Sequence, residues 1–141
     1  MRVIRSIVLS SILLVNTSLA QGIILNEAID GDTIRATLDS SNPILNKIYI
    51  RLHGVDTPEL FHPQCEEEKR LALEAKNYLQ SIILSNKISI RILGWDKYGG
   101  RVLAELYTEH DSISSLLIDK QLGIPYHGDR KTHSWCQHDS Q

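Results

Sequence analysis

The sequence has no surplus of positive charge. It contains 15 lysine and arginine residues against 17 aspartate and glutamate residues, a net charge of −2 over 141 residues. Proteins that hold long nucleic acids by non-specific electrostatic attraction usually carry a basic surplus. The composition therefore excludes a binding mode that depends on overall positive charge. If a phosphate group is the ligand, a few individually placed arginines must hold it.

The sequence also lacks an apolar run long enough to cross a membrane. The apolar run Ile7–Val15 is shorter than the roughly 20 residues that cross a bilayer. Two arginines precede it and small residues, Ser18 and Ala20, follow it, which is typical of a secretory signal cleaved after Ala20. We expect residues 1–20 to be removed, leaving an exported chain without membrane attachment. An uncleaved N-terminal helix or a membrane anchor is the alternative.

Cysteine is scarce as well, with Cys65 and Cys136 the two in the chain. In an exported protein such a pair is interpreted most simply as one disulfide. The alternative is a zinc site that combines Cys136 with His127, His133 and His138, although these spacings match no common zinc pattern.

The remaining pattern indicates one mainly β domain, since 141 residues suit a single core and no internal repeat is present. Five short alternating segments predict strands at 22–29, 32–38, 47–54, 87–93 and 101–107. Five strands suit a small barrel. We place the domain at 21–128 and expect the tail, 129–141, to be tied back by the disulfide.

Two helices are expected to pack on this barrel. Helical spacing across residues 65–84 places five residues on one face: Leu71, Ala75, Tyr78, Leu79 and Ile82. A second, shorter helix should begin after Asp111 or Ser112 and stop at Gly123, with Ile113, Leu116 and Leu117 directed inward. The predicted fold class is therefore α+β, mainly β.

Charged residues gather in three short motifs at strand ends or turns. They are "AIDGDTIR" (28–35), "RLHGVDTPE" (51–59) and "DKYGGR" (96–101). Each motif alone is more typical of an ordinary turn. Together, two acid-bearing strand ends and two arginines are what is needed to hold a hard divalent cation against a phosphodiester.

Arg51 stands out within the second motif. Apolar Ile48, Ile50 and Leu52 alternate along this strand with polar or aromatic residues, so Arg51 should point away from the apolar face. A guanidinium there needs an anionic partner or open water.

In this order and with these gaps, the motifs resemble the staphylococcal nuclease (thermonuclease) family from about Gly22 to Tyr126. The resemblance implies a five-stranded OB-fold barrel with packed helices. It also implies calcium-dependent hydrolysis of DNA and RNA, by a protein that we expect to act as a monomer. A non-catalytic OB-fold module that binds nucleic acid is the alternative.

The resemblance also assigns roles to individual residues. Asp32 and Asp56 would bind calcium together with the Thr57 carbonyl, and Asp30 would reach the ion through water. Glu59 would be the general base or orient the attacking water, and Arg51 and Arg101 would hold the phosphate. Tyr98 and Tyr126 would line the nucleotide pocket.

One departure affects Arg101, because "DKYGGR" carries one glycine more than the family motif "DKYGR". A hairpin tip can absorb an extra residue as a longer loop or a bulge without changing the face of the next strand. We therefore expect Arg101 to remain at the phosphate.

Overall fold

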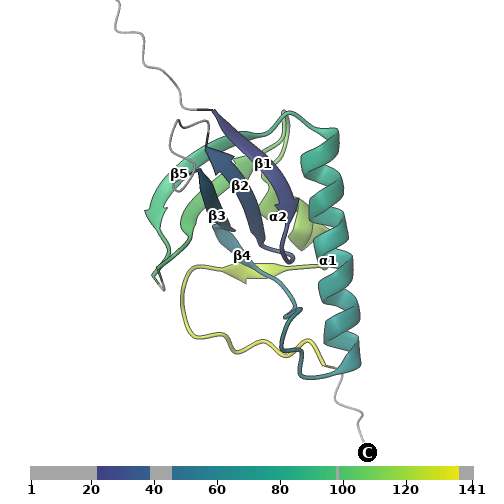
Figure 1. Ribbon diagram of the computed structural model, residues 1–141. Helices are drawn as coiled ribbons and strands as arrows, with labels where there is room; N and C mark the ends of the chain where they lie inside the picture. Colours follow the sequence, from purple (N-terminus) through teal and green to yellow (C-terminus); the bar gives the residue numbers. More distant parts are fainter. Residues whose placement is uncertain (1–21, 39–45, 98, 137–141) are drawn as a thin grey trace, which may run out of the picture.

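The computed structural model describes residues 22–38, 46–97 and 99–136. A curved five-stranded sheet forms the centre of the molecule, with two helices against it (Figure 1). Its strands are β1 (Ile23–Ala28), β2 (Thr33–Leu38), β3 (Lys47–Leu52), β5 (Ser89–Trp95) and β6 (Val102–Tyr107). The other elements are α1 (Glu66–Ser85), α2 (Ile113–Asp119), and a small sheet of β4 (Gly54–Asp56) with β7 (Ile124–Tyr126).

The five-stranded sheet is mixed and open. Its order is β1-β2-β3-β6-β5, antiparallel throughout except where β3 and β6 pair in parallel. Within the described residues the edge strands β1 and β5 do not pair, so the predicted closed barrel is wrong. Helix α1 packs beside β1 and supplies Gln80 Oε1, which accepts a hydrogen bond from Ala28 N at 2.8 Å. A helix thus lies along an edge at which closure would require a strand.

The core lies between the sheet and the two helices. Its largest fully buried apolar side chains come from both layers: Ile34, Ile50, Leu52, Val55, Leu79, Leu106, Ile113 and Leu117. The predicted face of α1 packs here, with Ala75, Leu79 and Ile82 buried and the other two residues partly buried. No helix in the described part of the chain has the length and apolar character to cross a membrane.

Helix α2 ends earlier than expected, at Asp119 rather than at Gly123. The chain leaves the helix at Gln121, which has a left-handed backbone with φ of 59°, and Leu122 N donates to Leu117 O at 2.9 Å. Gly123 has a different role, because a Cβ there would lie 2.5 Å from Val55 Cγ2. The glycine allows close packing of the chain against β4 and does not cap the helix.

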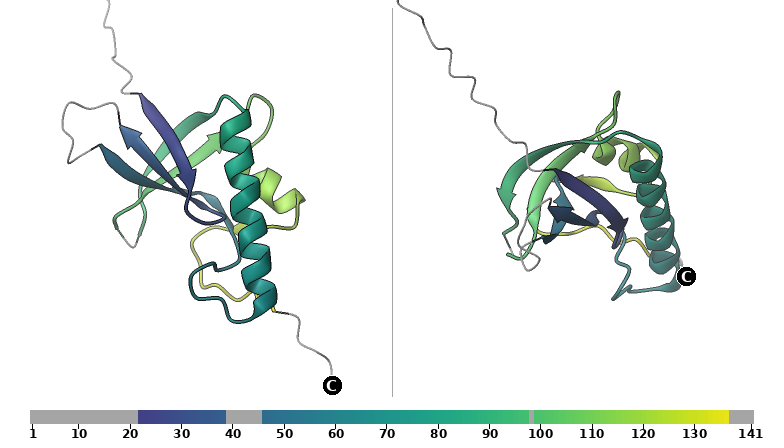
Figure 2. Two further views of the ribbon diagram at one scale, coloured as in Figure 1. Left: turned by 45° about the vertical axis from the view of Figure 1, so that its right-hand side comes forward. Right: turned by 45° about the horizontal axis from the view of Figure 1, so that its top comes forward.

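The disulfide prediction is confirmed, since Cys65 and Cys136 are bonded across 71 residues of sequence. The bond ties the tail to the start of α1, where Cys65 is also the N-cap and its Sγ accepts from Glu68 N at 3.4 Å. Figure 2 shows the tail, in yellow, leaving β7 and returning to this end of the helix. The zinc alternative is wrong because the Cys136 thiolate is not free, and His138 lies outside the described residues.

Candidate functional site

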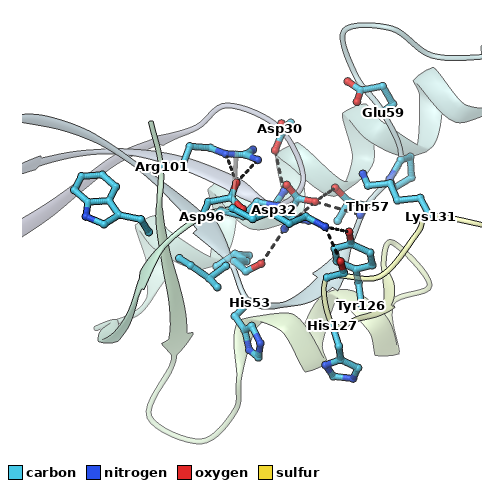
Figure 3. A pocket seen from close by; sticks show the side chains of 17 residues that line it. Asp30, Asp32, His53, Thr57, Glu59, Asp96, Arg101, Tyr126, His127 and Lys131 are labelled. Atoms are coloured by element: carbon cyan, nitrogen blue, oxygen red, sulfur yellow. Dashed lines mark hydrogen bonds and ion pairs between the residues drawn. The ribbon is translucent and has the colours of Figure 1, made fainter. Parts of the chain in front are cut away.

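A cleft of about 520 Å³ opens where the ends of β2 and β3, the β5–β6 hairpin and the tail meet (Figure 3). Most of the predicted site residues line it: Asp30, Asp32, Arg51, Thr57, Glu59, Arg101 and Tyr126. Asp56 is buried in contact with this group. Tyr98 lies outside the described residues.

Arg51 is the structural centre of the cleft. Its Nη1 donates to Leu52 O at 2.8 Å and to Val55 O at 3.0 Å, and lies 3.1 Å from Asp32 Oδ2. Its Nη2 lies 3.7 Å from Asp56 Oδ1. With 8% of its surface exposed, Arg51 is far more buried than a strand residue facing water. The guanidinium therefore holds the two carboxylates in place.

Asp32 is held from several sides. Its Oδ2 accepts from Thr57 N at 3.3 Å and from Thr57 Oγ1 at 3.1 Å, while Thr33 Oγ1 donates to Oδ1 at 3.3 Å. Burial raises the pKa of Asp32 to about 7 despite the opposing charge of Arg51. A carboxylate in this position would be stabilised by an additional cation beside it.

Gly31 explains why the first motif contains a glycine. A Cβ there would lie 2.6 Å from Thr57 Oγ1 and 2.8 Å from the Ala75 side chain of α1. The turn that carries Asp32 is thereby pressed between α1 and the Thr57 loop. Asp30 stabilises this turn by accepting from Asp32 N at 3.0 Å.

Asp56 has an unusual environment. Its Oδ1 is buried and meets no donor at a hydrogen-bonding angle within the described structure, yet Lys131 Nζ forms an ion pair with it at 2.6 Å. Lys131 comes from the tail, which crosses the cleft between Tyr126 and the disulfide. Lys131 was not predicted from the sequence, and its closeness in sequence to Cys136 is the one signal that could have suggested it.

Arg101 lies at the rim of the cleft, 32% exposed. Gly99 and Gly100 both have positive φ, 72° and 73°, and the turn is closed by Asp96 N donating to Arg101 O at 2.9 Å. Asp96 Oδ2 in turn accepts from Arg101 Nη2 at 2.6 Å, and Arg101 Nη1 donates to Thr33 Oγ1 at 3.3 Å. The second glycine is thus accommodated within the turn, and Arg101 lines the cleft.

Glu59 is exposed, and in Figure 3 it lies on a different side of Asp32 from Arg101. Its Oε1 accepts from Phe61 N at 3.0 Å. Its backbone is fixed by buried Glu68 of α1, whose carboxylate accepts from Glu59 N at 3.2 Å and from Gln64 N at 2.6 Å. Glu68 was not among the residues predicted from the sequence, and its role in positioning Glu59 is visible only in the structure.

Replacing Glu68 by glutamine is expected to destabilise the protein by about 1–3 kcal/mol, because the amide offers one acceptor oxygen in place of two. Urea unfolding measures the effect. Glu66→Gln, at an exposed position of the same turn, is the control and should change stability by less than about 0.5 kcal/mol. Equal effects of the two substitutions would contradict the positioning role.

The cluster suits a hard cation in its donor chemistry. Within the described ranges no three histidine, cysteine, aspartate or glutamate side chains are arranged to hold a metal ion. Asp32 and Asp56 nevertheless present buried carboxylate oxygens, one of them without a hydrogen bond, and Thr57 lies against them. Oxygen donors of this kind are those that calcium prefers. The residues present therefore fit calcium.

The sequence of this chain matches a known protein family. A comparison with curated proteins found no match. The family model of the staphylococcal nuclease homologue matches residues 49–136, which is more than half of the chain. The match contains Arg51, Asp56, Glu59 and Arg101 together with both cysteines, while Asp32 precedes it and joins the site through its contacts with Arg51 and Thr57. The protein carries a nuclease-type or nucleic-acid-binding domain and belongs to the staphylococcal nuclease homologue family.

Proposed function

We propose that the protein is an exported, calcium-dependent nuclease that hydrolyses phosphodiester bonds of DNA, RNA or both with little sequence preference. It would act as a monomer, without membrane attachment after signal cleavage. Membership of the family supports the nuclease-type activity. The secretory pattern of residues 1–20 and the disulfide support export.

The observation that carries this proposal is the buried Arg51, which joins Asp32 and Asp56 at the base of a cleft that Glu59 and Arg101 also line. A module that only binds a polyanion gains nothing from carboxylates at this place, since they repel phosphate. Carboxylates become useful when a cation and a proton acceptor are both needed.

Each residue has a task that follows from its chemistry. Asp32 and Asp56, with Thr57, would hold a calcium ion, which when bound polarises the phosphate. Arg101, at the rim, would bind non-bridging phosphate oxygens through its guanidinium, and Arg51 would do so from below. Glu59 would accept a proton from the attacking water. Tyr126 would border the nucleotide, with its hydroxyl already donating to Asp129 O at 2.7 Å.

The test is incubation of the purified mature protein with single-stranded DNA and with RNA, in calcium and in excess chelator. We expect cleavage in calcium and loss of cleavage in chelator, because two carboxylates without the ion repel the substrate. Substrate affinity should also fall as salt rises, since arginine contacts to phosphate release counterions. Undiminished cleavage in chelator would refute the role of the metal.

The same experiment separates the nuclease from a pure binding module. Trp95 is one of two tryptophans, lines the cleft and is 74% exposed, so its fluorescence should report an occupied cleft. A change in Trp95 emission with intact DNA at every metal condition would favour the binding module. The Trp95→Phe variant identifies the source of the signal, because Trp135 is then the one tryptophan that remains.

A further inference from the structure

We propose that Lys131 is the resident counter-cation of the Asp32–Asp56 carboxylate pair and that a divalent cation must displace it in order to bind. This inference rests on the proposed function and adds to it a residue that sets the metal affinity of the site. It assigns a role to the tail, which otherwise only leads to the disulfide.

Lys131 occupies the position next to the carboxylate that a metal would use. Lys131 Nζ lies 2.6 Å from Asp56 Oδ1, the buried oxygen that accepts no hydrogen bond within the described structure. The same oxygen also lies 3.7 Å from Arg51 Nη2. The ammonium therefore neutralises the carboxylate that a metal would use. A lysine ammonium is ordinarily charged at neutral pH, so Lys131 meets this oxygen as a cation.

The charges of the cluster also favour an exchange of Lys131 for a divalent cation. When both carboxylates are ionised, Asp32 and Asp56 bring two negative charges and Arg51 and Lys131 bring two positive charges, so these four groups sum to zero without metal. A divalent cation added beside Lys131 would leave two uncompensated positive charges in a buried place, which is costly. With the ammonium gone, one positive charge remains, and the single negative charge of a phosphodiester neutralises it.

The exposure of the Lys131 side chain allows it to leave the site. The side chain of Lys131 is 57% exposed, whereas that of Asp56 is 6% exposed. A lysine with its stem in water can turn outward without a change in the backbone. The backbone of the tail stays in place because Cys136 is bonded to Cys65 and Tyr126 Oη donates to Asp129 O. Displacement therefore costs mainly the ion pair.

The experiment measures calcium binding by titration calorimetry and thermal stability, using the mature protein and its Lys131→Met variant. Removing the competing ammonium should tighten calcium binding about threefold to tenfold, the range for a partly exposed ion pair. In chelator the variant should melt about 3 °C lower than the wild type, because Asp56 loses its partner. In saturating calcium the two proteins should melt at the same temperature. Calcium has then displaced Lys131 from Asp56 in the wild type, and the variant has no lysine at this position.

Two controls isolate the ion pair. Lys131→Arg keeps the charge and should keep the weaker affinity of the wild type. Lys87→Met changes net charge equally at an exposed position that does not line the cleft, and should alter neither measurement. Calcium affinity in Lys131→Met that equals or falls below that of the wild type would overturn the inference. So would a stability difference that persists in saturating calcium.

The outcome also distinguishes this inference from the proposed function. A wild type that cleaves DNA in calcium, together with a variant of unchanged affinity, refutes the role of Lys131 alone. A wild type that neither binds calcium nor cleaves refutes the proposed function, and this inference with it.

Discussion

Replacement of Arg51 by lysine is expected to lower both the cleavage rate and the stability of the protein. Arg51 Nη1 donates to Leu52 O and Val55 O and forms an ion pair with Asp32. The ammonium of a lysine, at the end of a flexible stem, cannot reproduce the geometry of the planar guanidinium. Loss of a preorganised donor reduces kcat by about 10²–10³. Loss of hydrogen bonds from a buried charged group should cost about 1–3 kcal/mol of the free energy of unfolding.

Arg101→Lys provides the informative comparison. Arg101 is partly exposed and pairs with Asp96 at the rim of the cleft, so its replacement should leave the free energy of unfolding within about 1 kcal/mol of the wild type. Its kcat should nevertheless fall by a factor that corresponds to about 2–4 kcal/mol, if the guanidinium binds the phosphate in the transition state. Measurements of kcat and of urea unfolding on both variants separate the two roles.

Arg91→Lys is the matched control, since Arg91 pairs with Glu105 on the exposed side of β5 and does not line the cleft. It should change neither quantity appreciably. Turnover close to wild type in Arg101→Lys, beside a collapse in Arg51→Lys, would show that Arg101 binds no phosphate and that the longer hairpin has taken it out of the chemistry.

Removal of the disulfide is expected to have the largest effect on stability. The bond closes 71 residues of chain, and the chain-entropy relation gives about 4 kcal/mol for a loop of that size. Cys136→Ser should therefore lower the midpoint of urea unfolding markedly. The carboxylates proposed to bind calcium and Arg51 belong to the β2–β4 region, so cleavage should survive under conditions where the variant is folded.

Cys65→Ser tests the origin of that loss. Serine at position 65 still offers a side-chain oxygen to Glu68 N, so this variant keeps the helix cap and loses only the bond. Equal losses in the two serine variants would assign the effect to the closed loop. A loss below about 1 kcal/mol in both would show that the tail contributes little constraint to the unfolded chain.

Local sequence signals predicted the five strands of the large sheet and both helices, because each lies within one segment, whereas the short strands β4 and β7 were not predicted. The alternation around Arg51 and the helical spacing of Leu79 and Ile82 describe a single strand or helix, and the core confirms both. Closure of the sheet depends on how β1 and β5 meet, which no local pattern contains. The end of α2 was misplaced because Gly123 serves packing against Val55 and the turn occurs at Gln121.

The residues of the site divide in the same way. Asp32, Asp56 and Arg101 stand in recognisable motifs, so their positions could be proposed from sequence. Lys131 acts through Asp56, which is distant in sequence, and Glu68 acts through the backbone N–H of Glu59. The residues around Lys131 indicate only a polar tail, and those around Glu68 indicate only the start of a helix. The burial of Arg51 was also not predicted, because alternation along a strand shows on which face of the sheet a side chain lies but not whether other residues cover that face.

The parallel pairing of β3 with β6 also bears on how the molecule acquires its cleft. Residues 53–101 separate the two strands, so this pairing requires a long chain closure, which slows folding. The β1–β3 meander can assemble Asp32 and Arg51 locally, but Arg101 joins them only after β6 has docked. On refolding from denaturant, the complete cleft is therefore one of the last features to form, and function should return later than most of the secondary structure.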